Sequence, residues 1–282
     1  GGLAAAVALQ KAGLKVTVFE QSAAITEVGA GISISPNAAL AIKDLGLSDA
    51  FHRVAYAPEY QVVRHWESGK QLAQVTRGAR LMETYGERYY TVQRADLQSL
   101  LARAVAAHDP DAIRLGHRFE RFEQDAGGVT VHFADGKSAR GDVLVGADGV
   151  RSRVRSQLFG PEEVRFTGFI AYRGLVPMEL VPKEAMDPAC QVWMGRRLML
   201  NRYPVSGGKL QRTRFDQSEL RTRTEYLQPV TGICDCGDRQ NRSAAGIAVR
   251  AAADDDAGAC ADPAAFAAAQ AKSSRLSAGP PL

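Results

Sequence analysis

The stretch that decides the fold is residues 1–20, GGLAAAVALQKAGLKVTVFE. Leu3 and Val7 stand among alanines, which predicts a helix packed closely on a sheet, and Gly13 is placed to end that helix. The residues from Lys15 to Glu20 alternate apolar and polar side chains, and Val, Thr and Phe favour a strand. The stretch therefore predicts a helix followed by a strand in an α/β domain.

This order is typical of the second half of a dinucleotide-binding βαβ unit. The full fingerprint is G-x-G-x-x-G with an acidic residue about 20 positions later. Gly2 fits the third glycine, and Glu20 follows eighteen residues later at the tip of the strand. A carboxylate there accepts hydrogen bonds from an adenosine ribose and disfavours a 2′-phosphate, which predicts FAD or NAD rather than NADP. The first strand, the first two glycines and an initiator Met are absent, so we interpret the chain as N-terminally truncated. An ordinary α/β packing unit would give the same pattern.

Composition narrows the class of protein. The chain has 282 residues, 45% hydrophobic and 23% charged, with a net charge of +4, which is typical of one large or two modest globular domains. It has no run of five basic residues and no apolar run long enough to span a membrane, so neither a nucleic acid nor a membrane is an expected partner. The four cysteines show neither a disulfide framework nor a zinc spacing, and Cys234-x-Cys236 lacks a second pair. We expect no metal and a cytoplasmic location.

Three segments between residues 29 and 108 predict a glycine-rich turn or loop, a hairpin and a helix. Gly29 to Gly31 reads Gly-Ala-Gly, which is either a plain loop or a place where the backbone approaches a ligand. Residues 59–76 predict a hairpin. Residues 94–108 predict a helix with one apolar face, and Arg94 stands at its start. By residue type alone, Arg94 is a solvated arginine.

A second motif follows a predicted buried strand at Val143–Val145. Asp148-Gly149 ends this strand, and Ser152 and Arg155 come next on a helical turn. Ligands of open α/β sheets bind outside the carboxyl ends of the strands, so we expect this turn to lie at a ligand site.

Together these segments resemble the group A FAD-dependent aromatic hydroxylases of the para-hydroxybenzoate hydroxylase-like superfamily, in particular the branch of salicylate hydroxylase and 6-hydroxynicotinate 3-monooxygenase. The family motif D-G-x-x-S-x-x-R is matched at all four of its positions by Asp148, Gly149, Ser152 and Arg155. The resemblance covers about residues 1–210, and the runs that carry it are GGLAAAVALQKAGLKVTVFEQ, EVGAGISISPNA, QRADLQSLLARAV, GADGVRSRVR and YPVSGGKL.

The resemblance implies roles for individual residues. Gly2 and Glu20 would hold the adenosine half of FAD, and Arg94 would reach the pyrophosphate region. Gly29 and Gly31 would lie in the loop near the flavin. The Asp-Gly motif would bind FAD through Asp148, Gly149 and Arg155. Arg155 would also take part in binding the pyridine nucleotide. Tyr172 and Tyr203 would line or support the substrate face, although each also fits a plain core position.

The implied activity is aromatic hydroxylation. In the family NADH or NADPH reduces FAD, O2 adds to form a flavin C4a-hydroperoxide, and one oxygen passes to a small phenolic or N-heteroaromatic acid. A nearby base activates the phenol, and the sequence does not identify it. His52, His65 and His117 are candidates by residue type, and each fits better as a surface or strand histidine. A monomer or a homodimer is expected.

The implied fold is α/β, an incomplete Rossmann-like FAD-binding domain with an inserted β-sheet substrate layer. FAD-binding segments are expected at 1–57 and 94–160, a hairpin of the substrate layer at 58–93 and its main β layer at 161–210. The resemblance and the strand pattern stop after Leu210. In residues 211–282, Leu, Ile, Val and Phe make up 10 of 72 residues, which indicates a low-complexity tail.

Two questions stay open at the level of sequence. We hypothesise that the tail arises from a shifted reading frame, and the rival is a genuine disordered or helical extension. The alternative to an active hydroxylase is a non-catalytic remnant with weak or no FAD binding. An NAD-dependent dehydrogenase is less favoured, because the Asp-Gly motif after a β-rich insertion is foreign to that layout.

Overall fold

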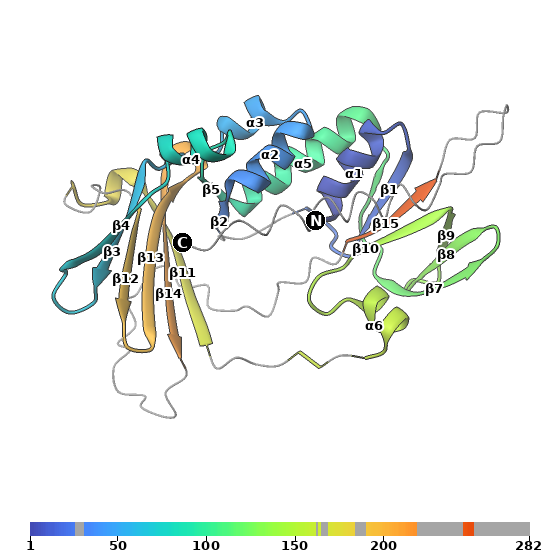
Figure 1. The fold of residues 1–282 in the computed structure, drawn as a ribbon. Helices are drawn as coiled ribbons and strands as arrows, with labels where there is room; N and C mark the ends of the chain where they lie inside the picture. Colours follow the sequence, from blue (N-terminus) through green and yellow to red (C-terminus); the bar gives the residue numbers. More distant parts are fainter. Residues whose placement is uncertain (26–30, 162, 165–168, 184–189, 219–244, 251–282) are drawn as a thin grey trace. The chain divides into compact units, whose positions relative to one another are not determined.

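The computed structural model describes residues 1–25, 31–161, 163–164, 169–183, 190–218 and 245–250. All of them fall in the unit Gly1–Ala251. Within these residues the strands form a four-stranded, a six-stranded, a three-stranded and a two-stranded sheet, and helices accompany them (Figure 1). The mixed α/β architecture confirms the predicted fold class.

The four-stranded sheet carries the first predicted motif. Its strands, in spatial order, are β10 (Val143–Ala147), β15 (Ala245–Arg250), β1 (Lys15–Glu20) and β6 (Ile113–Arg114). β15 runs antiparallel to both β1 and β10, so β1 and β10 point the same way. Glu20 and Ala147 are both paired with Ala245, which places the carboxyl ends of β1 and β10 level at one edge of the sheet.

Two helices pack together beside this sheet. α1 (Gly2–Lys11) and α5 (Arg94–His108) begin and end close to the predicted limits, and Gly13 follows α1 with φ 83°. Val16 and Val18 of β1 are almost fully buried and form one core cluster with residues of both helices. Their branched side chains suit a strand covered by helices, and small alanines let the helices approach it.

A second helical layer rests on a two-stranded sheet. Its elements are β2 (Gly31–Ile34), β5 (Tyr90–Gln93), α2 (Pro36–Asp44), α3 (Ser48–His52) and α4 (Ala79–Tyr85). Ile34, Phe51, Val92 and Leu100 of α5 share one core cluster. α5 therefore contributes to both cores and fixes β2 relative to β1.

The six-stranded sheet is mostly antiparallel. Its strands, in spatial order, are β11 (Phe169–Pro177), β14 (Leu210–Ser218), β13 (Leu198–Val205), β12 (Gln191–Gly195), β3 (Tyr60–His65) and β4 (Gln71–Thr76). β3 and β4 are the hairpin predicted for residues 59–76. Thr91 of β5 donates a side-chain hydrogen bond to the Pro204 carbonyl at 2.6 Å, which joins this sheet to the two-stranded sheet.

The remaining sheet supports the second motif. It consists of β7 (Phe119–Asp125), β8 (Gly128–Phe133) and β9 (Ser138–Gly141), with α6 (Arg153–Phe159) beside it; two short 3-10 helices, η1 (Met178–Leu180) and η3 (Ser206–Gly208), lie elsewhere in the chain. Phe119 and Phe133 bury their rings with Phe19 of β1 and Val154 of α6. This cluster ties α6 to the four-stranded sheet.

Three predictions need correction or comment. The strand at Val143–Val145 is not buried, since Val143 is 55% exposed because β10 is an edge strand. The loss of strand pattern after Leu210 is also wrong, because β14 continues to Ser218 and β15 lies between β1 and β10. The low apolar content of the whole segment hid these short strands. Gly29, residues 219–244 and residues 251–282 lie outside the described residues, so the reading-frame hypothesis stays a prediction.

Candidate functional site

Asp148 follows β10 and organises the turn that leads into α6. Its side chain is buried, and its two carboxylate oxygens accept three hydrogen bonds. The Ser152 hydroxyl donates to Oδ1 at 2.5 Å, and the backbone N–H groups of Arg153 and Val154 donate to Oδ2 at 2.6 and 3.2 Å. These are free N–H groups in the first turn of α6, whose N-cap residue is Ser152, so Asp148 adds two further acceptors to that cap.

The other members of the Asp-Gly motif complete the same turn. Gly149 has φ 78°, a left-handed conformation that favours glycine, and its carbonyl accepts from the Ser152 N–H at 3.1 Å. Ser152 Oγ accepts from the Arg155 N–H at 2.9 Å, and Arg155 Nη2 donates to the Val150 carbonyl at 2.9 Å. The spacing of the motif is thus explained by bonds among its own members, a role that the sequence did not reveal. Binding of a cofactor by Asp148, Gly149 and Arg155 remains a prediction.

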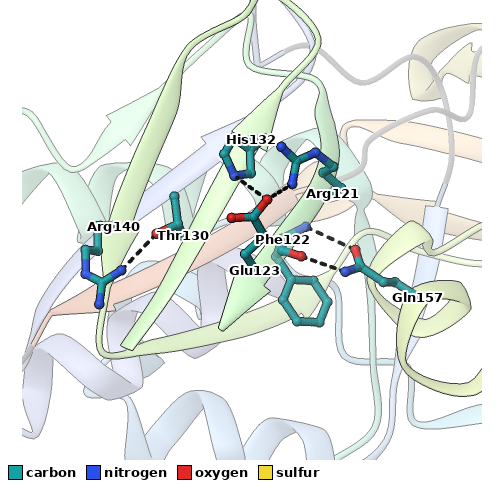
Figure 2. A network of polar contacts seen from close by, with 7 residues as sticks. All are labelled: Arg121, Phe122, Glu123, Thr130, His132, Arg140 and Gln157. Atoms are coloured by element: carbon teal, nitrogen blue, oxygen red, sulfur yellow. Dashed lines mark hydrogen bonds and ion pairs between the residues drawn. The ribbon is translucent and has the colours of Figure 1, made fainter. Parts of the chain in front are cut away.

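A polar network then fixes α6 on the three-stranded sheet (Figure 2). The side-chain amide of Gln157 donates to the Phe122 carbonyl at 2.6 Å, and its oxygen accepts from the Phe122 N–H at 3.0 Å. On the same sheet, Glu123 pairs with Arg121 and lies 3.7 Å from His132 Nε2. The hydrogen bond from Arg121 lowers the pKa of Glu123. These bonds hold the sheet that supports the motif turn.

Glu20 and Gly2 lie where the first motif predicts them. Glu20 ends β1 and is buried, and its Oε1 accepts from the Ser22 N–H at 2.9 Å. Gly2 is the buried first residue of α1. Because β1 and β10 end level at one edge of the sheet, Glu20 and Asp148 both lie at that edge.

Gly31 and Arg94 are brought together by β2 and β5. Gly31 is paired with Gln93, the residue before Arg94. A Cβ atom on Gly31 would lie 2.3 Å from Arg212 Cδ and 2.9 Å from the Tyr203 ring. The backbone of β2 therefore approaches the six-stranded sheet so closely that only glycine fits, and this contact is what the Gly-Ala-Gly pattern contributes at Gly31.

Tyr203 and Tyr172 lie on opposite faces of the six-stranded sheet. Tyr203 is paired with Arg212, while the neighbour of Tyr172, Arg173, is paired with Arg214 two residues further along β14. Paired residues share a face and neighbours alternate, so Tyr203, Arg212, Arg214 and Arg173 share one face and Tyr172 takes the other. The structure thus separates the two tyrosines, and the face of Tyr203 is the one in contact with Gly31.

Arg212 is a buried cation on this face. It is 2% exposed, and its Nη1 donates to the Tyr203 hydroxyl oxygen at 2.6 Å. Its Nε has no hydrogen-bond partner among the described residues. Burial lowers the pKa of Arg212, and burial likewise raises the pKa of Tyr203.

A cavity of about 400 Å³ opens on the same face, at the end of the β12–β13 hairpin. Its lining consists of Gly195, Arg197, Leu198, Met199, Arg214 and Asp216. Arg214 donates to Asp216 Oδ1 from Nε at 2.8 Å and from Nη2 at 2.7 Å. Its volume is within the range of small-molecule sites. Sequence reasoning missed Arg214 and Asp216 because they follow Leu210, although charges at alternate positions of residues 212–216 indicate one polar strand face.

The three candidate histidines do not line this cavity. His52 Nε2 lies 3.1 Å from the Tyr90 hydroxyl, which itself donates to Glu87 at 3.0 Å; burial raises the pKa of Tyr90 to about 12. His65 Nδ1 contacts Ser68, and His117 Nδ1 lies 2.7 Å from the Leu115 carbonyl. Each histidine thus has a local structural partner.

Two other classes of site find no support among the described residues. No group of three or more metal-ligating side chains occurs in these parts of the chain. Cys190 is buried, and burial raises the pKa of its thiol to about 12, which makes it a poor nucleophile.

No described helix combines the length and the apolarity that a membrane crossing requires.

Comparisons with known proteins show the family of this chain. A family model described as FAD binding domain matches residues 1–189. The chain is 37% identical over 210 residues to 6-hydroxynicotinate 3-monooxygenase of Pseudomonas fluorescens, covering 73% of this chain and 53% of the relative. It is 36% identical over 208 residues to 3-amino-4-hydroxybenzoate 2-monooxygenase of Streptomyces cremeus, covering 74% and 52%.

A solved structure gives the same result. The structure of Klebsiella pneumoniae HpxO complexed with FAD and uric acid matches with a TM-score of 0.69 and 33% identity, covering 80% of this chain and 56% of HpxO. The resemblance found in the sequence is confirmed. The chain spans about half the length of the curated relatives it matches.

Proposed function

Because the chain belongs to the FAD-binding domain family, whose relatives here are FAD-dependent aromatic hydroxylases, we propose that it hydroxylates a small phenolic or N-heteroaromatic acid with NADH or NADPH and O2. The observation that carries this proposal is the contact of Gly31 with Tyr203 and Arg212. It brings the strand that follows the predicted flavin loop against one polar face of the six-stranded sheet.

The described residues fit FAD at the edge of the four-stranded sheet. Glu20 places a carboxylate at the end of β1, which suits an adenosine ribose hydroxyl. The N-terminus of α1 at Gly2 presents backbone N–H groups and the positive end of the helix dipole, which suit a pyrophosphate. Arg94, at the start of α5 and next to Gln93, would add a cation.

FAD, when bound, supplies the redox chemistry and the activation of O2. The chain would supply the binding of an acidic aromatic substrate. One face of the six-stranded sheet carries three cations, Arg173, Arg212 and Arg214. Of the side chains named on this face, only Asp216 is a carboxylate, so the named charges sum to a positive value. A buried cation such as Arg212 favours an anionic partner. These charges support an acid as the substrate.

The experiment is turnover by the purified full chain loaded with FAD. The aromatic panel comprises 6-hydroxynicotinate, 3-amino-4-hydroxybenzoate, 3-hydroxybenzoate and urate, each with NADH or NADPH. We expect one acid to stimulate oxidation of the reduced nucleotide and to gain one oxygen atom from labelled O2. Retained flavin without any stimulated oxidation or hydroxylated product would favour the non-catalytic remnant. Membership of the FAD-binding family disfavours the dehydrogenase alternative.

A further inference from the structure

Only one of the two carboxylate oxygens of Asp216 accepts hydrogen bonds from the described residues. Asp216 is 7% exposed, and both hydrogen bonds from Arg214 go to Oδ1. Its Oδ2 is buried and has no hydrogen-bond partner among the described residues. Buried polar atoms in folded proteins nearly always have a partner, and a buried acceptor without one costs about 1–3 kcal/mol. Among the described residues, this oxygen therefore has an acceptor position to which no protein group donates.

The surroundings define the chemistry of that donor. An ionised carboxylate only accepts hydrogen bonds, so its partner must carry an O–H or an N–H. Leu198 and Met199 also line the cavity, and Met199, which is paired with Asp216, offers an apolar surface on the same face against which a flat ring can pack. Arg197 and Arg214 also line it, and Arg212 lies two residues before Arg214, about 7 Å along the strand on the same face. The lining thus combines an acceptor, an apolar surface and cations.

We propose that Asp216 accepts a hydrogen bond from the ring hydroxyl or ring N–H of an anionic aromatic ligand bound in this cavity. This inference rests on the proposed function, and it assigns to Asp216 the orientation of the substrate. Such a bond also shifts electron density from the O–H or N–H bond toward the ring, which favours attack of the ring on an electrophilic oxygen. Arg214 acts through Asp216 by fixing the carboxylate.

The test is equilibrium binding of a matched pair of ligands to the full chain. The probes are 3-hydroxybenzoate and 3-fluorobenzoate, which have similar size and the same carboxylate, but only the first carries a donor. Isothermal titration calorimetry measures both dissociation constants without turnover. We expect the wild-type chain to bind the hydroxyl compound at least about tenfold more tightly, because a site built to bind a hydroxyl rejects the analogue that lacks it.

Two variants test whether the preference for 3-hydroxybenzoate depends on Asp216. In Asp216→Asn the oxygen stays available to Arg214 and an NH2 group replaces Oδ2, so we expect the preference to fall to about threefold or less. Asp135→Asn is the matched control, because Asp135 is exposed and pairs with Lys137 in the β8–β9 turn; it should keep the wild-type preference. Circular dichroism verifies that each variant is folded.

The outcomes are distinct. A wild-type preference near onefold overturns the inference whether or not Asp216→Asn folds, and so does a preference that survives in a folded Asp216→Asn variant. If flavin-dependent hydroxylation occurs without this preference, the role of Asp216 fails and the proposed function stands. If the preference is present and depends on Asp216 while no flavin is retained, the proposed function fails and Asp216 remains a ligand-binding residue.

Discussion

The turn at Asp148 and the strand face of β14 both carry buried charges, but they use them differently. Both carboxylate oxygens of Asp148 accept hydrogen bonds from Ser152, Arg153 and Val154, so this carboxylate is fully used within its own turn. On β14, Arg212 Nε and Asp216 Oδ2 are buried without a hydrogen-bond partner among the described residues. Asp148 therefore stabilises its own turn, whereas Arg212 and Asp216, which belong to no recognised motif, each keep a polar atom without a partner among the described residues. This comparison yields predictions that we order by expected effect.

The largest effect should come from Asp148→Ala. The change removes the acceptor of three hydrogen bonds and leaves two backbone N–H groups in the first turn of α6 without their acceptor, so we expect the free energy of unfolding to fall by about 3 kcal/mol. Urea denaturation followed by circular dichroism measures it. Ser156→Ala is the control in the same helix, since Ser156 makes one hydroxyl bond to the Ser152 carbonyl, and it should change stability by less than about 0.5 kcal/mol. Equal effects in the two variants would show that the turn is not closed as described.

Gly31→Ala should cost about 2 kcal/mol. The added Cβ would collide with Arg212 and Tyr203, and overpacking of this kind costs about 1–3 kcal/mol. Gly174→Ala is the control on the same sheet, because a Cβ there meets nothing within 4 Å. It should be neutral or slightly stabilising. A stable Gly31→Ala protein would contradict the close approach of β2 to β14.

Tyr203→Phe should cost about 1–2 kcal/mol. It removes the hydroxyl that accepts from the buried Arg212 and leaves that donor without a partner. Tyr85→Phe changes the same group at a side chain that is 58% exposed, so denaturation should detect almost no difference there. If both variants lose the same stability, Arg212 does not depend on Tyr203.

Arg197→Gly should raise stability by about 1 kcal/mol. Arg197 has φ 65°, a left-handed conformation that costs a side-chain-bearing residue about 1–2 kcal/mol, and glycine avoids this cost. The thermal midpoint should rise by a few degrees. A lower midpoint would show that contacts of the Arg197 side chain outweigh the backbone strain.

Local patterns predicted much of the fold. The helix at residues 94–108 and the hairpin at 59–76 were predictable because apolar periodicity and turn residues are local signals. The burial of β10 was not, because the place of a strand in the sheet depends on its partners, and β15 comes from the far end of the chain. β14 was missed for a different reason: it is nine residues long, and such a short charged strand carries little weight in the composition of a 72-residue segment.

The candidate site was predictable in part. The sequence predicted that Glu20 and Asp148 lie at strand ends, since motif spacing fixes residues relative to strand ends. It placed Gly31 in a loop, whereas Gly31 is the first residue of β2. It grouped Tyr172 with Tyr203 because, without strand register, the face of a side chain is unknown. It found no binding residue on β14, because a missing hydrogen-bond partner is visible only in three dimensions.

The central proposal is that the sheet edge at Glu20 and Asp148, together with Gly31 and Arg94, forms an FAD site. The most direct measurement is an absorbance spectrum of the purified full chain after incubation with FAD and desalting. The account predicts retained flavin bands, retained equally by Gly174→Ala and reduced in Glu20→Ala, which loses the ribose acceptor. A colourless protein with intact circular dichroism would contradict it, and so would flavin that Glu20→Ala retains as well as the wild type.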